Sequence, residues 1–200
     1  MSRPLEFCFD FISPYSYIAL HALPRFVEGK DIDVVYKPVF LGAIMRGTDN
    51  RPPGFVPAKN AYMQTDIQRS CRRYGIGFRM HPSFPIMNTR PALRIACALA
   101  GSPSDQSDFI RAVFHGVWAA PEPLETDDLE QIGAACRAAG LDAERLVSLA
   151  DGAEAKALLV QNTDQAIARG AFGAPSMFVG DELFFGHDRL DYAVEAAVSA

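Results

Sequence analysis

The fold of this chain follows from one short segment, Phe9-Asp10-Phe11-Ile12-Ser13-Pro14-Tyr15-Ser16-Tyr17. An apolar run from Leu5 to Phe11 leads into it, as is typical of a strand buried on both faces. Ser13 is a favoured N-cap residue, and Pro14 suits the first position of a helix. Apolar residues then recur at helical spacing, at Leu20, Leu23 and Val27. The segment therefore predicts a strand, a tight turn and a helix that begins at a serine.

Two interpretations of Ser13 are open. A helix N-terminus has free amide groups and a partial positive charge, which favour an anion such as a thiolate. Ser13 could equally do no more than cap the helix. This order of elements is also where thioredoxin-like folds carry their active residue, and redox members have Cys-x-x-Cys there. Here the four residues are Ser13-Pro14-Tyr15-Ser16, so dithiol exchange at this position is excluded.

Composition narrows the class of protein. The chain has 200 residues, is 49% apolar and carries a net charge of −5 without a block of one sign. This charge disfavours binding to nucleic acid or to an anionic membrane. The N-terminal residues lack the features of a signal peptide, and no apolar run approaches the length that spans a membrane. We therefore expect a soluble, cytoplasmic protein.

The cysteines and histidines show no metal-site pattern. The four cysteines are far apart in sequence and each lies in an apolar segment, which predicts buried free thiols: Cys8, Cys71, Cys97 and Cys136. The four histidines are also scattered. No metal site is expected.

The middle of the chain predicts a helical region. A second strand, Ile32 to Tyr36, precedes Pro38, which limits it to an edge position or ends it. Residues 42–58 are rich in turn formers and predict an irregular loop, which carries Asn50 and Arg51 and could bind a small anion or be a solvated surface. Helices are then predicted up to Gly170, one of them stopping at Gly75 and the later ones near 89–100, 105–119, 127–139 with Thr126 as its cap, 142–150 and 153–169.

The C-terminal part returns to β-structure. Two short strands, 176–179 and 182–185, flank a Gly180-Asp181 hairpin, and a helix with an apolar face follows over 190–198. Pro175 stands directly before the first of these strands, as either a cis-proline or an ordinary turn proline. We predict an α/β protein in which a thioredoxin-like domain, 1–42 and 171–200, is interrupted by an irregular loop and an all-helical insertion, 43–170.

With both ends in view, the chain resembles the 2-hydroxychromene-2-carboxylate isomerases and, with them, the kappa-class glutathione transferases. The resemblance covers the whole chain, and it implies a thioredoxin-like domain interrupted by a DsbA-like helical insertion. It is carried by the first segment quoted above and by four others: Phe40-Leu41-Gly42-Ala43-Ile44-Met45, Asn50-Arg51-Pro52-Pro53, Gly173-Ala174-Pro175-Ser176 and Phe185-Gly186-His187-Asp188-Arg189-Leu190.

The resemblance implies that glutathione is the cofactor. Ser13 matches the catalytic serine, whose hydroxyl binds the glutathione sulfur and increases its thiolate fraction. The other matching positions imply cofactor contacts. They are Asn50 and Lys59 at the glycine end, Ala174 with Pro175 at the cysteinyl part, and His187 with Asp188 near the γ-glutamyl end. His187 departs from the family pattern, because kappa transferases have serine at this position and isomerases often have Gln or Asn.

The isomerase resemblance implies a small aromatic α-keto acid or its cyclic hemiketal as substrate, reversible addition of the glutathione thiolate to it, and a homodimer. The substrate carboxylate would need a cation or amide nearby. The candidates are Asn88, which is preferred but could be a helix N-cap, and Arg51, Lys37 and Arg90. Two alternatives stay open: a kappa-like transferase or peroxidase, and a non-catalytic glutathione- or protein-binding module. They are separated by conjugation of a chloronitrobenzene and by thermal shift with glutathione.

Overall fold

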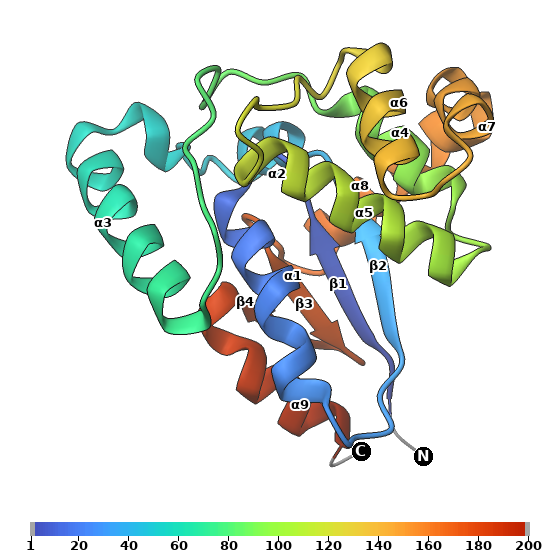
Figure 1. Cartoon of the computed structure of the whole chain (residues 1–200). Helices are drawn as coiled ribbons and strands as arrows, with labels where there is room; N and C mark the ends of the chain where they lie inside the picture. The colour runs from blue at the N-terminus through green and yellow to red at the C-terminus, as the bar shows by residue number, and fades with distance from the viewer. Residues whose placement is uncertain (1–2, 199–200) are drawn as a thin grey trace.

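The computed structural model describes residues 3–198, which form a four-stranded mixed sheet surrounded by helices (Figure 1). The strands are β1 (Leu5–Phe9), β2 (Val34–Pro38), β3 (Ser176–Val179) and β4 (Glu182–Phe185), in the order β2-β1-β3-β4. β1 runs parallel to β2 and antiparallel to β3, and β3 and β4 form the predicted hairpin. The two ends of the chain therefore build one sheet, and the α/β class is confirmed.

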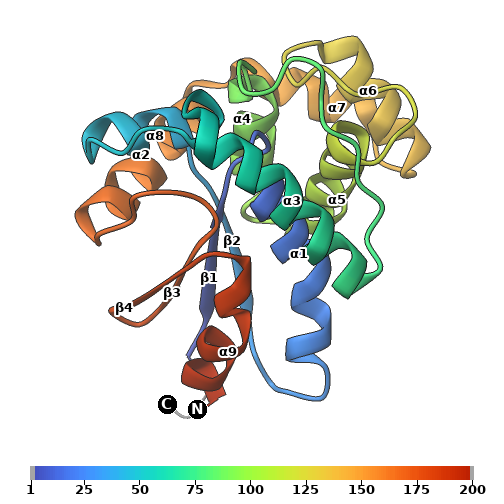
Figure 2. The ribbon, with the colours of Figure 1, turned by 90° about the vertical axis from the view of Figure 1, so that its left-hand side faces the viewer.

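The two faces of the sheet are covered by different helices. Phe7 and Phe9 of β1 point into the larger core, which includes α1 (Pro14–Val27) and α9 (Leu190–Val198). Cys8 points the other way, into a smaller core with α2 (Leu41–Gly47) and α8 (Ala153–Ala168). Figure 2 shows the sheet between these two layers. Alternation along a strand explains the arrangement, because successive side chains point to opposite faces.

The N-terminal prediction is confirmed. Ser13 is the N-cap of α1 and accepts a hydrogen bond from the Ser16 amide, while Pro14 occupies the first turn. Pro24 lies inside the helix, which ends three residues later at Val27. β2 is an edge strand and ends at Pro38, as its lack of an amide hydrogen requires.

The helical middle of the chain also follows the prediction. α3 (Pro57–Tyr74) stops at Gly75, whose φ of +64° suits glycine. Four further helices lie within three residues of their predicted ends. They are α4 (Arg90–Ala98), α5 (Pro103–Trp118), α6 (Leu129–Ala138) and α7 (Ala143–Ser148), and short 3₁₀ turns lie at Pro53–Phe55, Leu149–Asp151 and His187–Arg189.

Two local predictions were wrong. The segment expected to be irregular begins with the helix α2, which buries Ile44 in the smaller core. The cap of α6 is Asp128, whose Oδ1 accepts hydrogen bonds from the amides of Glu130 and Gln131. Thr126 instead donates its hydroxyl proton to the carbonyl of Asn88.

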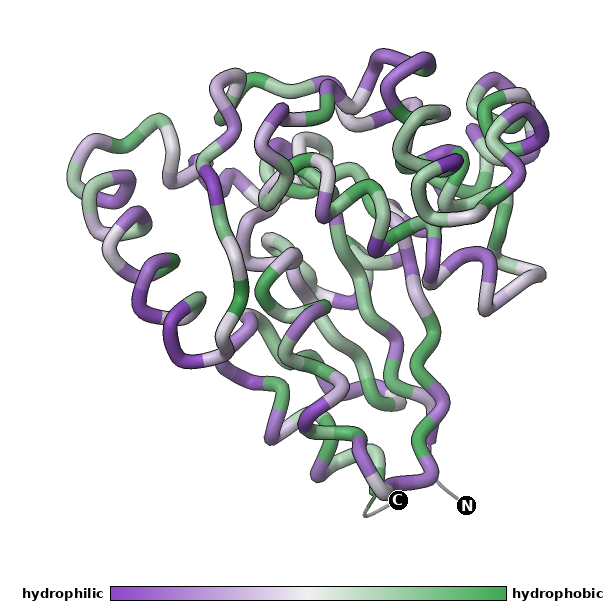
Figure 3. Tube along the Cα trace, in the orientation of Figure 1, coloured by the Kyte–Doolittle hydropathy of each residue, from purple (hydrophilic) through white to green (hydrophobic). Residues whose placement is uncertain are grey.

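The predicted boundary at residues 42 and 43 falls within α2. Within residues 3–198, the span 43–170 contains helices and turns and no strand. One hydrophobic core runs from β1 and α1 through α4 and α5 to α6 and α7. Figure 3 shows the strands and α1 as largely hydrophobic, whereas α3 is strongly hydrophilic toward its C-terminal end. The division of the chain into two domains stays a prediction.

Aromatic packing fixes the turn before Ser13. Phe11 contacts Phe114 of α5, with ring centres 4.8 Å apart. The indole Nε1 of Trp118, also on α5, donates a hydrogen bond of 2.9 Å to the carbonyl of Phe11. The side chains of Phe11 and Trp118 are both fully buried. The helical region thus holds the backbone that carries Ser13.

All four cysteines are buried and unpaired, as predicted. Burial raises the pKa of each of these thiols, to about 12 for Cys8 and Cys97 and about 11 for Cys71. Within the part of the chain that the structure describes, no helix is both long enough and apolar enough to cross a membrane.

We predict that Trp118→Phe lowers the free energy of unfolding by about 1–3 kcal/mol, because it leaves the buried Phe11 carbonyl without its donor. Loss of part of the ring adds to this cost. Urea unfolding measures the difference. Tyr192→Phe, at a side chain that is 54% exposed, is the control and should change stability by less than about 0.5 kcal/mol. Equal stability of Trp118→Phe and the wild type would contradict this role.

Candidate functional site

One large cavity, of about 1240 Å³, lies where the two predicted regions meet. Its walls are the turn after β1, the start of α2, the loop at 49–55, the inner side of α3, residues 84–89, the segment 173–175 and the turn after β4. Sites for small molecules usually occupy roughly 300–1,000 Å³, so this cavity has room for more than one small ligand.

Ser13 lies in this cavity, opposite the C-terminal half of the fold. Its Oγ donates a hydrogen bond of 2.9 Å to the carbonyl of Ala174 and accepts one of 3.1 Å from the Ser16 amide. The Ala174–Pro175 peptide bond is cis, as one of the two interpretations predicted. Ser13, Ala174 and Pro175 all line the cavity, so the structure brings these three predicted residues together.

Asp10 lies behind the Ser13 turn and has no exposed surface. Its Oδ2 accepts a hydrogen bond of 2.8 Å from the Leu41 amide at the start of α2, and its Oδ1 accepts one of 3.2 Å from the Ile12 amide. One carboxyl group therefore joins the turn that carries Ser13 to the wall formed by α2. Sequence reasoning assigned Asp10 no role, although an acid in a strand expected to be buried is an unusual feature.

Burial raises the pKa of Asp10 to about 6, because the charged form loses its hydration. Hydrogen bonds from the Leu41 and Ile12 amides, and the proximity of the Thr89 hydroxyl, offset part of this effect. The buried Thr89 hydroxyl influences the pKa, yet it forms no hydrogen bond of normal geometry with any group in residues 3–198. Perturbed carboxyl groups of this kind are concentrated at functional sites.

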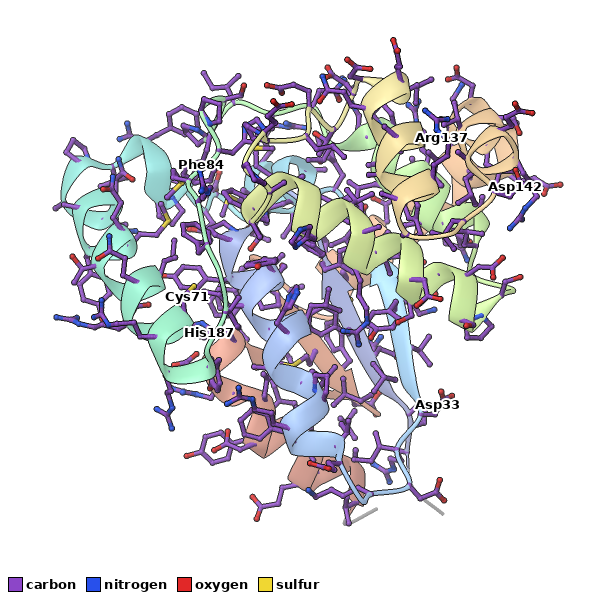
Figure 4. All side chains as sticks on the ribbon, viewed as in Figure 1. Asp33, Cys71, Phe84, Arg137, Asp142 and His187 are labelled. Carbon is purple, nitrogen blue, oxygen red and sulfur yellow. The ribbon has the colours of Figure 1, made fainter. Side chains whose placement is uncertain are left out.

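His187 takes part in a cluster between α1, α3 and the turn after β4. Its ring stacks on that of Tyr15, with centres 4.9 Å apart, and its Nε2 lies 2.8 Å from the Ser70 hydroxyl. The Tyr15 hydroxyl donates a hydrogen bond of 2.9 Å to Asp66 on α3. Burial lowers the pKa of His187. In Figure 4, His187 lies beside the C-terminal end of α3, and Phe84 lies near the opposite end of that helix.

Of the remaining predicted cofactor residues, two line the same cavity and one lies in a cleft beside it. Asn50 and Arg51 line it, and their side chains donate hydrogen bonds to the carbonyls of Phe172 and Phe55, respectively. Asp188 also lines it and forms an ion pair of 2.9 Å with Arg189. Lys59 does not line the main cavity; it lies in a smaller adjoining cleft that shares Tyr15 and Tyr62 with it.

Two predicted substrate residues, Asn88 and Lys37, are not brought to the cavity. Asn88 is a half-buried residue whose side chain forms hydrogen bonds with Asp127 and Arg90, and the α4 cap position belongs to Thr89. Lys37 is opposite Cys8 in the β1–β2 register, and paired residues point to the same face, here that of α8. Arg90 is likewise outside the cavity lining.

The sequence did not reveal the arginines that line this cavity apart from Arg51. They are Arg46 on α2 and Arg69 and Arg73 on α3. Arg69 and Arg73 are one helical turn apart, so their spacing predicts that they share one face of α3. Nothing in the sequence indicated that this face would line the cavity.

Comparisons with known proteins identify the family and the fold of this chain. The family model for the DSBA-like thioredoxin domain matches residues 4–197. Glutathione S-transferase kappa 2 of Caenorhabditis elegans is 32% identical, over 94% of this chain and 88% of that protein. The 2-hydroxychromene-2-carboxylate isomerase of Sphingobium xenophagum is 30% identical, over 96% of each. A solved structure of a 2-hydroxychromene-2-carboxylate isomerase superimposes with a TM-score of 0.83 at 27% identity, covering 98% of this chain and 94% of that one.

We predict a pH-dependent difference in stability between the wild type and Asp10→Asn. The Asp10 pKa is about 6 in the folded state and about 3.9 in the unfolded state, so the folded protein binds the proton more tightly. Its contribution to stability is full below about pH 4 and is lost as pH rises to about 6, by roughly 3 kcal/mol in total.

The asparagine variant does not ionise and should lack this loss. Urea unfolding at pH 4.0 and 7.5 therefore gives a wild-type advantage that shrinks as pH rises. Parallel dependence in the two proteins would show that Asp10 does not titrate as described.

Proposed function

Since this chain belongs to the DsbA-like thioredoxin domain family, with the 2-hydroxychromene-2-carboxylate isomerases and the kappa-class glutathione transferases, we propose that it is a glutathione-dependent isomerase. The proposed reaction interconverts 2-hydroxychromene-2-carboxylate and compounds of the trans-o-hydroxybenzylidenepyruvate type. The observation that carries the proposal is the Ser13 hydroxyl, 2.9 Å from the Ala174 carbonyl in a large cavity, with serine where redox relatives need cysteine.

The residues around Ser13 fit a cysteinyl thiol. A hydroxyl donor at a helix N-terminus stabilises a thiolate and lowers the pKa of the thiol from its ordinary value of about 8.5. The Ser13 proton now goes to the Ala174 carbonyl. On binding of a thiol, Ser13 would direct this proton to the sulfur, and the carbonyl would become free to accept from the amide of the cysteinyl residue. The buried cysteines of the chain cannot supply the sulfur, because none lines the cavity.

The rest of the cavity supports a charged tripeptide. Asn50, Arg51 and, from the adjoining cleft, Lys59 would hold the glycine carboxylate. At the other end, Asp188 would bind the ammonium of the γ-glutamyl part. His187 is already engaged with Tyr15 and Ser70, so we assign it to holding α3 against α1 rather than to direct contact.

Bound glutathione would supply a thiolate that adds reversibly to the conjugated double bond of the substrate. The hemiketal ring then opens or closes at its C–O bond, the former double bond rotates, and the thiolate leaves unchanged. The protein's part is to keep that thiolate ionised through Ser13, to orient the aromatic substrate and to exclude water. Phe40, Phe84 and Met87 give the cavity an apolar wall for an aromatic ring. We propose further that the protein is a cytoplasmic homodimer.

A second candidate is a kappa-like transferase or peroxidase. The similar identities to a kappa transferase and to an isomerase favour keeping it. Conjugation of a chloronitrobenzene consumes glutathione, whereas isomerisation leaves its concentration unchanged, so a thiol titration during turnover separates the two. A non-catalytic binding module would show a thermal shift with glutathione and no turnover of either substrate.

We predict that the wild type catalyses a glutathione-dependent absorbance change with 2-hydroxychromene-2-carboxylate and that Ser13→Ala lowers kcat/KM by roughly 10²–10³-fold, as for loss of one preorganised donor. Ser16→Ala is the matched control. It removes a buried hydroxyl one turn away that forms no hydrogen bond within residues 3–198, and it keeps the backbone amide that Ser13 accepts from.

Thermal melting of both variants excludes unfolding as the cause, since loss of the N-cap alone costs about 1 kcal/mol. No turnover by the wild type, or full turnover by Ser13→Ala, would rule out the proposed isomerase mechanism.

A further inference from the structure

We propose that Arg46 and Phe40 form the subsite for the carboxylate and ring of an aromatic second substrate, an inference that rests on the proposed function above. Both residues line the cavity. The guanidinium carbon of Arg46 lies 6.0 Å from the centre of the Phe40 ring, and that of Arg90 lies 5.7 Å from it. Two cations therefore approach one aromatic ring at the cavity wall.

The backbone of α2 permits this pair. A Cβ atom added at Gly42 would lie 3.2 Å from Cζ of Phe40 and 3.6 Å from Nη1 of Arg46. The absence of a side chain at Gly42 thus lets the ring and the guanidinium lie together over the first turns of the helix. The backbone of Phe40 is anchored to α8, because its amide donates a hydrogen bond of 3.0 Å to Thr163 Oγ1.

The charge of Arg46 is free to act on a ligand. Among the ion pairs and side-chain hydrogen bonds of residues 3–198, none involves Arg46. Arg46 is an exposed residue and also lines the cavity. By contrast, Arg51 donates to the Phe55 carbonyl, and Arg90 donates to Asn88 from outside the lining.

The position of α2 places this pair near the sulfur site. The Leu41 amide, between Phe40 and Arg46 in sequence, binds the same Asp10 carboxylate that holds the Ser13 turn. The other two cavity arginines, Arg69 and Arg73, are on α3, the wall that carries Asp66 and contacts His187. Arg46 is therefore the cation on the apolar wall, beside Phe40 and Met45, where an aromatic acid would lie.

These contacts specify the chemistry of the ligand. A guanidinium group binds a carboxylate with two parallel hydrogen bonds, and an aromatic ring stacks on another ring or offers its face to a cation. A planar molecule with a conjugated ring and a carboxylate meets both requirements. A neutral electrophile would use Phe40 alone.

The test measures binding of two probes, trans-cinnamate and its uncharged methyl ester, by calorimetry with and without saturating glutathione. Arg46→Gln should weaken cinnamate binding by roughly 10- to 100-fold, as loss of a charge-assisted bidentate pair implies, and leave ester binding within about twofold. Gly42→Ala should weaken cinnamate several-fold with all charges intact, and Phe40→Leu should weaken both probes.

Arg137→Gln is the matched control, because Arg137 is on α6, far from Phe84 and His187 in Figure 4, and is outside the cavity lining. Its affinity for cinnamate should equal that of the wild type.

Each other outcome has one meaning. If the wild type does not bind cinnamate, or if Arg46→Gln weakens acid and ester equally or not at all, the subsite is overturned. If Arg46→Gln weakens glutathione binding instead, Arg46 belongs to the glycine carboxylate and the subsite is again overturned. If glutathione fails to bind the wild type while cinnamate binds through Arg46, the proposed function fails and the subsite stands.

Discussion

The hydrogen bond between the Ser13 hydroxyl and the Ala174 carbonyl joins two parts of the chain that are 161 residues apart. It can form because β1 pairs antiparallel with β3, which brings the end of the first strand beside the beginning of the third. The function proposed for this protein depends on this contact between Ser13 and Ala174. The serine supplies a donor, the carbonyl supplies an acceptor, and the helices between them in sequence enclose the space in front of both.

The helical region does more than enclose the cavity. Trp118 holds the carbonyl of Phe11, and the Asp10 carboxyl holds the amides of Ile12 and Leu41. The Ser13 turn is thereby fixed from two sides, by α5 and by the start of α2. Burial of Asp10 disfavours its charged form, so this carboxyl lowers stability at neutral pH compared with a group that keeps its hydration. The stability lost by burying Asp10 is consistent with a functional site, where a fixed position of the Ser13 turn matters more than the free energy of unfolding.

Much of this arrangement could be predicted from sequence because it rests on local chemistry. Ser13 followed by Pro14, Gly75 at a helix end and the Gly180-Asp181 hairpin each have a conformational reason that neighbouring residues reveal. Cavity contacts are different, since they depend on which way an exposed side chain faces. Asn88 turned toward Asp127, and Arg46 lies in a segment that was expected to be an irregular loop. Asp128, rather than Thr126, caps α6 for a similar reason. The Thr126 hydroxyl donates to the carbonyl of Asn88, a residue distant in sequence.

The four buried sulfhydryls have a consequence for how the protein would behave in a cell. Their surroundings keep them protonated and out of reach, so alkylating agents and peroxides would find no readily reactive cysteine on the folded chain. Any thiol that meets a second molecule in the cavity would have to arrive from outside by diffusion, because no cysteine of the chain lines it. With the proposed function, oxidative stress would leave these cysteines intact, while turnover would fall and recover with the ambient pool of reduced low-molecular-weight thiol.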